Sequence, residues 1–395
     1  MRHRQARIAV AVALAQKVGS GGHASFVVNL IAGLRRLGYE PMLLDRIEPG
    51  SCVDGQGRPC EPAASANAAW VRHVVELTGT RGGFSLELEG MERTLGMSRD
   101  EAAASLEAAL VLDVAGFFAH RPIVDGAARR VFVDIDPGFP QMWREEGLVD
   151  LYGSHDAHVT IGLNMGADDC GIPGGDIDWI TTPQPVVLGA WPARRPGGDA
   201  FTSVITWRGA YGPVERGGRT YGLRVHEFRK FVDLPRRSGR RFELALDIHP
   251  DEQRDLALLR DGGWSLVNPR GVAGDSESYR RYIQRSRGEL MVAKNIYVDT
   301  HSGWFSDRSV CYLASGRPVL AQDTGWSRHF PTDGGLLAFS TLDDAVLGIE
   351  EIERDYERHC RAARGVAERY FDSDLVLRRL LDQLEVEPAM QMAAP

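Results

Sequence analysis

Residues 294–308 combine charged, hydroxyl and aromatic side chains around the predicted start of a helix. Lys294 ends a predicted strand, a polar loop is expected over residues 295–303, and Ser306 is a natural N-cap for a helix over residues 306–315. The first N–H groups of a helix have no intrahelical partners, so they favour an anion. Residues 294–308 are therefore the first candidate for an anion-binding site.

Neighbouring side chains could complete this site for a nucleoside diphosphate. Arg208 follows another predicted strand, and with Lys294 it could supply cationic partners for the two phosphates. Asp307 could accept hydrogen bonds from ribose hydroxyls, and Trp207 or Trp304 could stack on a base or sugar. Each residue also has an ordinary interpretation, because Ser-x-Arg is a common helix start and surface lysine or arginine is usually a solvated charge.

The segment Gly19-Ser20-Gly21-Gly22-His23 connects the first predicted strand to a helical pattern. No Lys-Ser or Lys-Thr pair follows the glycines, so the segment is not a P-loop, and it lacks the third glycine of the dinucleotide fingerprint. A Rossmann oxidoreductase is correspondingly disfavoured. His23, at the helix start, could be a general base that deprotonates an acceptor hydroxyl, or it could be a capping or packing histidine.

Carboxylates follow another strand of the first half, expected over residues 130–133. Asp134 and Asp136 flank a single residue ahead of a Pro-Gly turn, and Asp136 is a candidate catalytic base. Asp113 has a similar but weaker claim. Aspartate before proline is also ordinary turn chemistry, so a purely structural role stays open.

No metal site is predicted. His155 and His158 lie three residues apart, so on a strand their side chains would point to opposite faces. The five cysteines are scattered and none belongs to a Cys-x-x-Cys pair. This spacing does not fit a zinc site, and it favours a reducing cytoplasm over a disulfide scaffold.

Length and composition are those of a globular protein with two domains. The chain has 395 residues, of which 43% are hydrophobic and 25% are charged. Its net charge of -8 argues against nucleic acid as a partner, since such proteins usually carry a basic face. No apolar run approaches the roughly 18 residues of a membrane span.

Two series of alternating predicted strands and helices indicate two α/β lobes. Several strands read as continuous apolar runs, which is typical of parallel sheets covered on both faces. Residues 171–198 are rich in Pro and Gly and predict a linker. Strands are expected over residues 8–14, 41–44, 110–114, 130–133, 157–161, 203–207, 242–247, 264–267, 289–293 and 318–321. Helices are expected over residues 63–78, 99–109, 222–234, 252–260, 276–287, 306–315, 341–371 and 374–384.

The segment Tyr312-Leu313-Ala314-Ser315-Gly316-Arg317-Pro318-Val319 leads from a predicted helix into a buried strand. It resembles the donor-site helix and following strand of GT-B glycosyltransferases, which commonly carry a helix ending in a small residue and then Gly-x-Pro-Val. The resemblance covers most of the chain. It implies two Rossmann-like lobes facing a central cleft, and transfer of a sugar from a nucleotide diphosphate donor.

The resemblance also implies which domain binds the acceptor and which binds the donor. An acceptor-side domain is expected over residues 1–190 and a nucleotide-sugar-binding domain over residues 200–365. The remaining segment, residues 366–395, would carry a helix that crosses back to the first lobe. The glycine loop would let the donor phosphate approach closely. The donor-binding residues expected are Gly21, Gly22, Trp207, Arg208, Lys294, Ser302, Gly303, Trp304, Ser306, Asp307 and Arg308.

The sequence departs from the family at one point. Many retaining members carry two glutamates eight residues apart around this helix, and here Gly303 and Cys311 occupy those positions. Asp307 lies one turn before Cys311 on the same helix face, so it could take the ribose role.

The expected function is transfer of a sugar from a UDP-, GDP- or dTDP-sugar to a soluble small-molecule acceptor in the cytoplasm. His23 or Asp136 would be the base, and neither a metal nor another cofactor is expected. Two other functions stay open on the same architecture. One is a sugar-nucleotide epimerase or hydrolase, which would act without an acceptor, and the other is a non-catalytic two-lobed binding protein.

Overall fold

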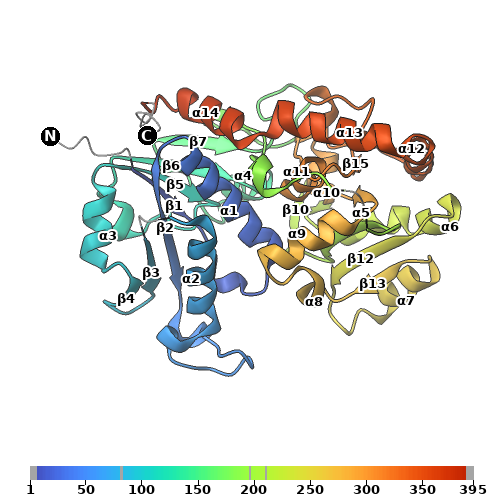
Figure 1. Ribbon diagram of the computed structural model, residues 1–395. Coiled ribbons are helices and arrows are strands. Elements are labelled where there is room, and N and C mark those ends of the chain that lie inside the picture. Colours follow the sequence, from blue (N-terminus) through green and yellow to red (C-terminus); the bar gives the residue numbers. More distant parts are fainter. Residues whose placement is uncertain (1–6, 81–82, 195–196, 210, 388–395) are drawn as a thin grey trace, which may run out of the picture.

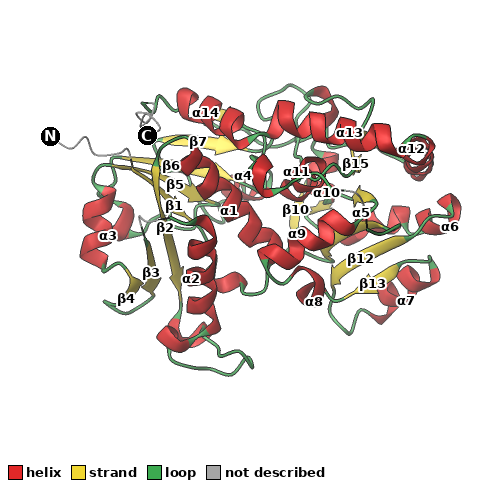
Figure 2. Cartoon of the chain, in the orientation of Figure 1, coloured by secondary structure: helices red, strands yellow, loops and turns green. Residues whose placement is uncertain are grey.

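Each half of the chain builds one mostly parallel sheet with helices on both of its faces (Figures 1 and 2). The computed structural model describes residues 7–80, 83–194, 197–209 and 211–387, so the start of the predicted first domain and the end of the predicted last segment lie outside the described residues. The arrangement confirms the prediction of two Rossmann-like α/β lobes.

The N-terminal lobe contains an eight-stranded sheet of order β4-β3-β2-β1-β5-β6-β7-β8. All of its pairings are parallel except that of β3 with β4. The strands are β1 Arg7–Ala11, β2 Glu40–Ile47, β3 Phe84–Leu88, β4 Thr94–Gly96, β5 Ala109–Val114, β6 Arg129–Asp134, β7 Ala157–Thr160 and β8 Trp179–Thr181. The helices are α1 Gly21–Arg36, α2 Ala66–Thr78, α3 Arg99–Leu106 and α4 Phe139–Glu145, and a short 3-10 turn, η1 Ala15–Lys17, follows β1.

The C-terminal lobe contains a six-stranded parallel sheet of order β13-β12-β9-β14-β15-β16, and a separate hairpin of β10 and β11. The strands are β9 Phe201–Thr206, β10 Val214–Arg216, β11 Arg219–Tyr221, β12 Phe242–Asp247, β13 Ser265–Val267, β14 Gly288–Met291, β15 Val319–Gln322 and β16 Leu336–Phe339. The helices are α5 Arg224–Phe228, α6 Leu234–Ser238, α7 Gln253–Asp261, α8 Pro269–Ala273, α9 Ser276–Arg285, α10 Asn295–Asp299, α11 Asp307–Ala314, α12 Leu342–Arg354, α13 Tyr356–Val366 and α14 Ser373–Gln383.

The continuous apolar runs of the sequence become strands that are buried on both faces. Every residue of β5, β14 and β15 is buried, because helices cover the sheet above and below. In the N-terminal lobe, α1, α2 and α14 pack on one face of the sheet and α3 packs on the other. In the C-terminal lobe, α9, α11 and α13 form one layer, and α5, α6 and α12 form the opposite one.

Two predicted irregular segments contain regular structure. The linker prediction over residues 171–198 is wrong in part, because β8 lies within it and pairs with β7 as the last strand of the N-terminal sheet. The polar loop expected over residues 295–303 begins with the short helix α10. Its first residue, Asn295, accepts hydrogen bonds from the N–H groups of Gly222 and Leu223, so a tertiary contact stabilises that turn.

The helix expected over residues 222–234 is interrupted. α5 covers residues 224–228, a 3-10 turn follows over residues 229–231, and α6 begins only at Leu234, the last residue of the expected helix. Pro235, one residue beyond the expected range, lies in the first turn of α6, where its missing N–H costs nothing.

The last helix, α14, returns to the N-terminal lobe and packs against α1 (Figure 1). Leu377, Leu380 and Leu381 lie in the core of that lobe, and the Arg36 guanidinium donates to the Asp374 carboxylate with Nε–Oδ1 at 2.8 Å. The boundaries proposed at residues 190, 200 and 365 stay predictions.

None of the helices in the described ranges is long and apolar enough to cross a lipid bilayer. All five cysteines carry free thiols.

Candidate functional site

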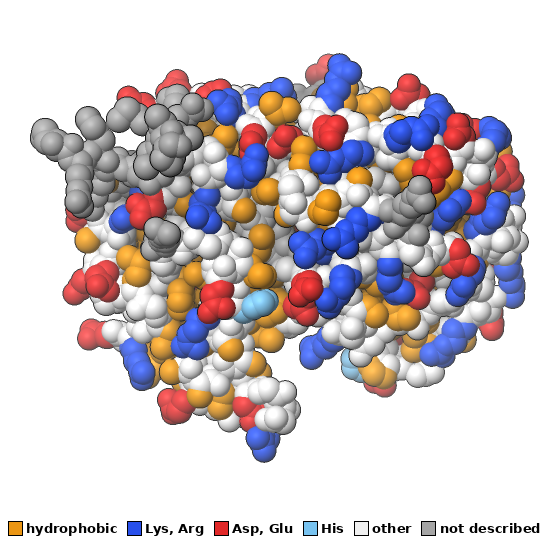
Figure 3. Space-filling model, in the orientation of Figure 1, with side chains coloured by type: hydrophobic (Ala, Val, Ile, Leu, Met, Phe, Trp, Pro, Cys, Tyr) orange, Lys and Arg blue, Asp and Glu red, His pale blue; other side chains and the backbone are white. Residues whose placement is uncertain are grey.

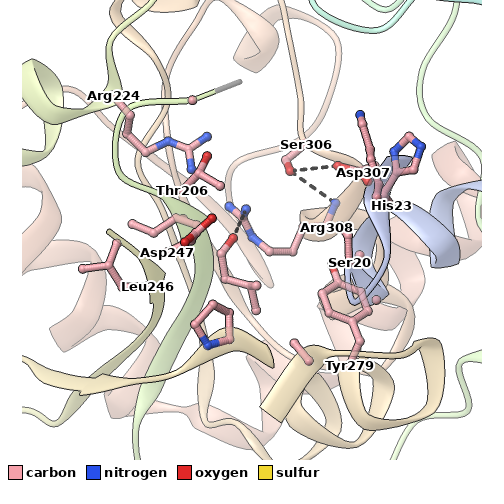
Figure 4. A pocket seen from close by; sticks show the side chains of 18 of the residues that line it. Ser20, His23, Thr206, Arg224, Leu246, Asp247, Tyr279, Ser306, Asp307 and Arg308 are labelled. Carbon is pink, nitrogen blue, oxygen red and sulfur yellow. Dashed lines mark hydrogen bonds between the residues drawn. The ribbon is translucent and has the colours of Figure 1, made fainter. Parts of the chain in front are cut away.

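A cavity of about 790 Å³ lies between the two lobes, at the carboxyl ends of their strands. The N-terminal lobe contributes η1, the start of α1 and the end of β6. The C-terminal lobe contributes the ends of β9, β12 and β13, with residues of α5, α8, α9, α10 and α11. Figure 3 shows a notch between the lobes on the lower edge of the molecule, and Figure 4 shows part of the cavity from close by.

The cavity is basic although the chain is acidic overall. Among the described residues that line it, six carry a cation and three carry a carboxylate, whereas the whole chain has a net charge of -8. Such an excess favours an anionic ligand. The cations are those of Lys17, Arg224, Arg260, Arg270, Lys294 and Arg308, and the carboxylates are those of Asp136, Asp247 and Asp307.

The start of α11 is built as the sequence predicts. Ser306 is its N-cap, and its Oγ accepts a hydrogen bond from the Arg308 N–H at 3.2 Å. The Arg308 side chain turns back under the cavity, where Nε donates to Glu289 Oε1 at 2.5 Å and Nη1 donates to the Val204 carbonyl at 2.8 Å. Its remaining nitrogen, Nη2, is buried and has no partner among the described residues.

Arg224 is the functional candidate that sequence reasoning missed. Its side chain lines the cavity, the residue is only 7% exposed, and Nε has no hydrogen-bond partner among the described residues. Burial, and then the nearby charge of Arg308, lower the pKa of Arg224 to about 10. Both guanidinium groups reach into the same part of the cavity (Figure 4). No sequence signal marks this arginine, because it falls inside a predicted helix with no motif around it.

Lys294 and Asp136 both line the cavity, but they bind each other across the two lobes. Lys294 Nζ donates to Asp136 Oδ1 at 2.7 Å, and the Tyr297 hydroxyl donates to the same oxygen. Burial raises the pKa of Asp136, but Lys294, the hydrogen bond of Tyr297 and the charge of Lys17 together hold it below its usual value. This makes Asp136 a weak proton acceptor, since a general base works best with a pKa near the working pH.

His23 lines the cavity at the start of α1, and its ring is tied to the backbone. Nε2 lies 2.8 Å from the Ala13 carbonyl, which can only accept, so Nε2 carries the proton and Nδ1 is left as the acceptor. Burial, and then the charge of Lys17, lower the pKa of His23 to about 3. The imidazole is therefore neutral at physiological pH and is a weak base.

Acidification from pH 7 to pH 5 is expected to lower the free energy of unfolding more in the unmodified protein than in a His23→Gln variant. Histidine titrates near pH 6.5 in an unfolded chain and near 3 at this site, so between these values the unfolded state binds more protons and the native state loses stability as the pH falls. The expected difference is about 1–2 kcal/mol. Urea denaturation at both pH values measures it, with His73→Gln, an exposed position on α2, as the control. An unchanged pH dependence in His23→Gln would contradict the assignment.

Two predicted donor-binding residues lie outside the cavity. Trp207 is 1% exposed in the core of the C-terminal lobe, where its indole N–H donates to Asp255 Oδ2 at 2.8 Å, so it cannot stack on a ligand. Arg208 points to solvent with a side chain 54% exposed and pairs with Glu252. Both predictions are wrong for the same reason. The side chains that follow a strand end alternate between the two sides of the sheet, and neither of these two turns toward the cleft.

The loop before α11 has a structural role. Ser302 is fully buried, and its hydroxyl donates to the Tyr297 carbonyl and accepts from the Trp304 N–H. Gly303 has a φ of +73°, and a Cβ there would lie 2.7 Å from the Asn164 nitrogen in the other lobe. Neither residue lines the cavity, so their predicted donor contact is wrong. Trp304 does line it, but one face of its ring is stacked on Tyr297 at 4.3 Å.

Asp307 lines the cavity beside the predicted anion site and turns toward the α1 side in Figure 4. Burial raises its pKa, and the Ser306 hydroxyl lies 3.4 Å from its Oδ1. Cys311 is buried and does not line the cavity; its Sγ contacts the amide of Asn29 at 3.9 Å. Of the helix residues weighed for the ribose role, Asp307 is therefore the one with access to a ligand.

Gly21 and Gly22 line the cavity where α1 meets the C-terminal lobe. A Cβ on Gly21 would lie 2.3 Å from the Asp275 carbonyl oxygen and 2.5 Å from that of Ala273. A Cβ on Gly22 would lie 3.4 Å from the Tyr279 ring, which is ordinary contact. Glycine is thus needed at position 21 for the approach of the two lobes.

The other carboxylates weighed from the sequence are structural. Asp134 is buried and accepts hydrogen bonds from Gln141 and Thr160, and burial raises its pKa to about 6. Asp113 accepts from the Phe118 N–H and lies 3.1 Å from His155 Nε2. In the described ranges no group of three or more His, Cys, Asp or Glu could hold a metal ion.

His155 and His158 do not point to opposite faces as expected. Their ring centroids are 6.4 Å apart and both rings contact Phe132. The strand β7 begins only at Ala157, so strand alternation does not apply to His155.

No family model and no curated protein matches the sequence. Solved structures match over nearly their whole length. Alr3699/HepE from Anabaena, in complex with UDP and glucose, has a TM-score of 0.58 at 10% identity, with 97% of this chain and 100% of that chain covered. Sucrose-phosphate synthase from Thermosynechococcus elongatus has a TM-score of 0.56 at 12% identity, with 96% and 99% covered. AviGT4, a glycosyltransferase involved in avilamycin A biosynthesis, has a TM-score of 0.54 at 14% identity, with 96% and 97% covered. The arrangement they share with this chain is the GT-B fold, as predicted.

Proposed function

We propose that this chain is a glycosyltransferase that moves a sugar from a nucleoside diphosphate donor to a soluble small-molecule acceptor. One observation carries the proposal. Arg224 and Arg308 each hold a buried guanidinium nitrogen without a partner among the described residues, and both residues line the same cavity of a GT-B fold. Buried donors without partners are costly, and a diphosphate would satisfy them with charge-assisted hydrogen bonds.

In this proposal the nucleotide lies on the C-terminal lobe. The apolar side chains at the ends of β12 and β13 form a wall for the base, and the two arginines hold the diphosphate. This wall consists of Leu246, Ile248, Leu266, Val267 and Pro269. During transfer, negative charge develops on the departing diphosphate, and fixed cations in a closed cavity stabilise it without reorganisation.

The acceptor is proposed to enter from the N-terminal side, between η1, the start of α1 and the end of β6. Closure of the lobes keeps water from the donor and so limits its hydrolysis. We propose that no metal ion is needed, because the four arginines that the C-terminal lobe contributes to the cavity can balance the diphosphate. The structural relative that carries UDP and glucose makes UDP-sugars the first donors to test.

Binding of UDP, GDP and dTDP and their glucose conjugates, measured by isothermal titration calorimetry with and without EDTA, tests this function. At least one nucleotide is expected to bind at micromolar concentration, and EDTA is not expected to weaken it. Mass spectrometry with a panel of small alcohols and sugars then distinguishes the outcomes. A glycosylated acceptor supports transfer, free sugar alone indicates a hydrolase, and binding without any product indicates a binding protein. No binding of any nucleotide would refute the proposal.

A further inference from the structure

Lysine is rare in this chain, and two of its three positions lie in the interlobe cavity. The sequence has 46 basic residues other than histidine, of which three are lysines, so 43 are arginines. Lys17 and Lys294 line the interlobe cavity, while Lys230 lies on the surface, where its side chain is 58% exposed and pairs with Glu227. Lysine carries a compact point charge on a flexible stem, whereas arginine presents a wide planar fork. In an arginine-rich chain, lysine at two cavity positions indicates sites that need the smaller group.

Lys17 differs from Lys294 because its ammonium group is unused. Lys294 binds Asp136 and Tyr297, but the Lys17 side chain makes no hydrogen bond or ion pair with any residue in the described ranges. Asp136 and Asp307 lie within electrostatic reach of Lys17, yet each is hydrogen-bonded elsewhere. Three N–H donors therefore face the cavity without a partner.

The backbone that carries Lys17 is held in place. Asp45, buried under the turn, accepts hydrogen bonds from the N–H groups of Leu14 and Ala15, at 3.1 and 2.5 Å. The Asn67 amide donates to the Ala15 carbonyl at 2.9 Å, and the Ser20 N–H donates to the Lys17 carbonyl at 3.1 Å. Buried polar groups on two sides thus fix η1 and aim it at the cavity, which is how a binding residue is preorganised.

A second polar side chain of the same lobe is also free. Gln184 is 5% exposed, it lines the cavity, and its amide has no hydrogen-bond partner in the part of the chain that the structure describes. Because the residue lines the cavity, its amide can offer a donor and an acceptor to a polar ligand group at this wall. Ser20 adds a further polar group, because it precedes α1 without capping it by its side chain.

This N-terminal wall and the arginine pair belong to different lobes. Lys17 and Gln184 lie on the N-terminal lobe, whereas Arg224 and Arg308 lie on the C-terminal lobe, where Arg308 pairs with Glu289. The two sites adjoin each other, because Asp136 is within electrostatic reach of both Lys17 and Arg224, and Asp307 of both Lys17 and Arg308. A substrate that spans the cavity of about 790 Å³ can therefore place one anionic group on each lobe.

We propose that Lys17 and Gln184 bind a carboxylate or phosphate substituent of the substrate that is distinct from the donor diphosphate. This inference rests on the proposed function for the identity of the diphosphate. The substituent belongs either to the acceptor or to the transferred sugar, since both reach the junction of the lobes. The acceptor or the donor sugar is thus an acidic molecule, such as a sugar phosphate or a uronic acid.

The three lysines allow a direct test on the unmodified protein. Brief acetylation with an amine-reactive ester, followed by peptide mass spectrometry, reports the accessibility of Lys17, with Lys230 as the internal control. Glucose 6-phosphate or glucuronate is expected to slow acetylation of Lys17 at least threefold. Glucose should not slow it, and the acetylation rate of Lys230 should not change with any of these ligands. If protection by glucose 6-phosphate persists with UDP bound, the substituent is on the acceptor. If UDP-glucuronate protects better than UDP-glucose, it is on the sugar.

Two outcomes would overturn the inference. In the first, none of these acids protects Lys17. In the second, UDP alone protects it fully and Lys17→Met loses affinity for UDP, which would place Lys17 in the diphosphate site.

With Lys17→Met, the affinity for UDP is expected to stay within about twofold, and the affinity for the acidic sugar to fall roughly tenfold. Lys230→Met is the matched control. Failure of every nucleotide to bind would instead refute the proposed function, and the protection by acidic sugars would still be readable on its own.

Discussion

Replacement of Arg224 by methionine is expected to remove most of the nucleotide affinity and at the same time to make the unliganded protein more stable. The Arg224 guanidinium is buried beside Arg308 and its Nε has no partner among the described residues, so in the free protein it is an uncompensated charge. Methionine of similar length removes that cost, and the free energy of unfolding should rise by about 1–3 kcal/mol. Loss of its charge-assisted hydrogen bonds to phosphate should weaken nucleotide binding about 10- to 100-fold.

The opposite signs of the two effects identify a binding residue. Replacement of a purely structural arginine would lower the free energy of unfolding and the nucleotide affinity together. Thermal unfolding of the free protein and calorimetric titration with the preferred nucleotide measure both quantities. Arg208→Met is the matched control. The position of Arg208 after β9 predicts a phosphate contact, but its side chain pairs with Glu252 outside the cavity. Its nucleotide affinity should stay within about twofold, since surface ion pairs contribute little. Equal losses in the two variants would refute the assignment of Arg224.

Replacement of Gly21 by alanine is expected to keep the lobes from closing. The added methyl group would lie 2.3 Å from the Asp275 carbonyl oxygen, and both groups belong to backbone that cannot rotate away. Either α1 or the α8–α9 segment must shift, which separates the N-terminal wall of the cavity from the C-terminal wall. A displacement of about 1 Å at a reacting centre can cost about 100-fold in rate, and a loss of that size is expected for sugar transfer.

Nucleotide affinity should change much less in Gly21→Ala, because Arg224 and Arg308 both belong to the C-terminal lobe. Small-angle X-ray scattering should report a larger radius of gyration for the variant, and a transfer assay should report the lower rate. Gly365→Ala serves as control, since it adds the same methyl group to the helix α13 with no atom within 4 Å. A variant that closes and transfers sugar normally would show that this contact does not limit the approach of the lobes.

Local signals were enough to predict many of the buried strands and the start of α11. The apolar runs gave the strands because parallel strands covered on both faces are continuous in hydrophobicity. Ser306 was predicted as an N-cap because capping is a property of a few adjacent residues, and the structure confirms it. Gly21, placed in a glycine loop between a strand and a helix, lines the cavity, and its contact with a donor stays a prediction.

Side-chain direction could not be predicted in the same way. Trp207 and Arg208 follow a strand that is buried on both faces, so no polar–apolar alternation shows which residue faces the cleft. The structure sends one into the core and the other to the solvent. Lys294 and Asp136, expected to act separately on phosphate and acceptor, bind each other, because two strand ends 158 residues apart in the chain meet across the cleft.

The sequence by itself determined the two α/β lobes and the start of α11, because each depends on residues close together in the chain. The tertiary structure alone decided which cations line the cavity. Arg224 and Lys17 lie on different lobes and belong to no motif, and they become binding candidates only because burial in one cavity leaves their charges without partners. Desolvation depends on what surrounds a group in space, and that surrounding is assembled from distant parts of the chain.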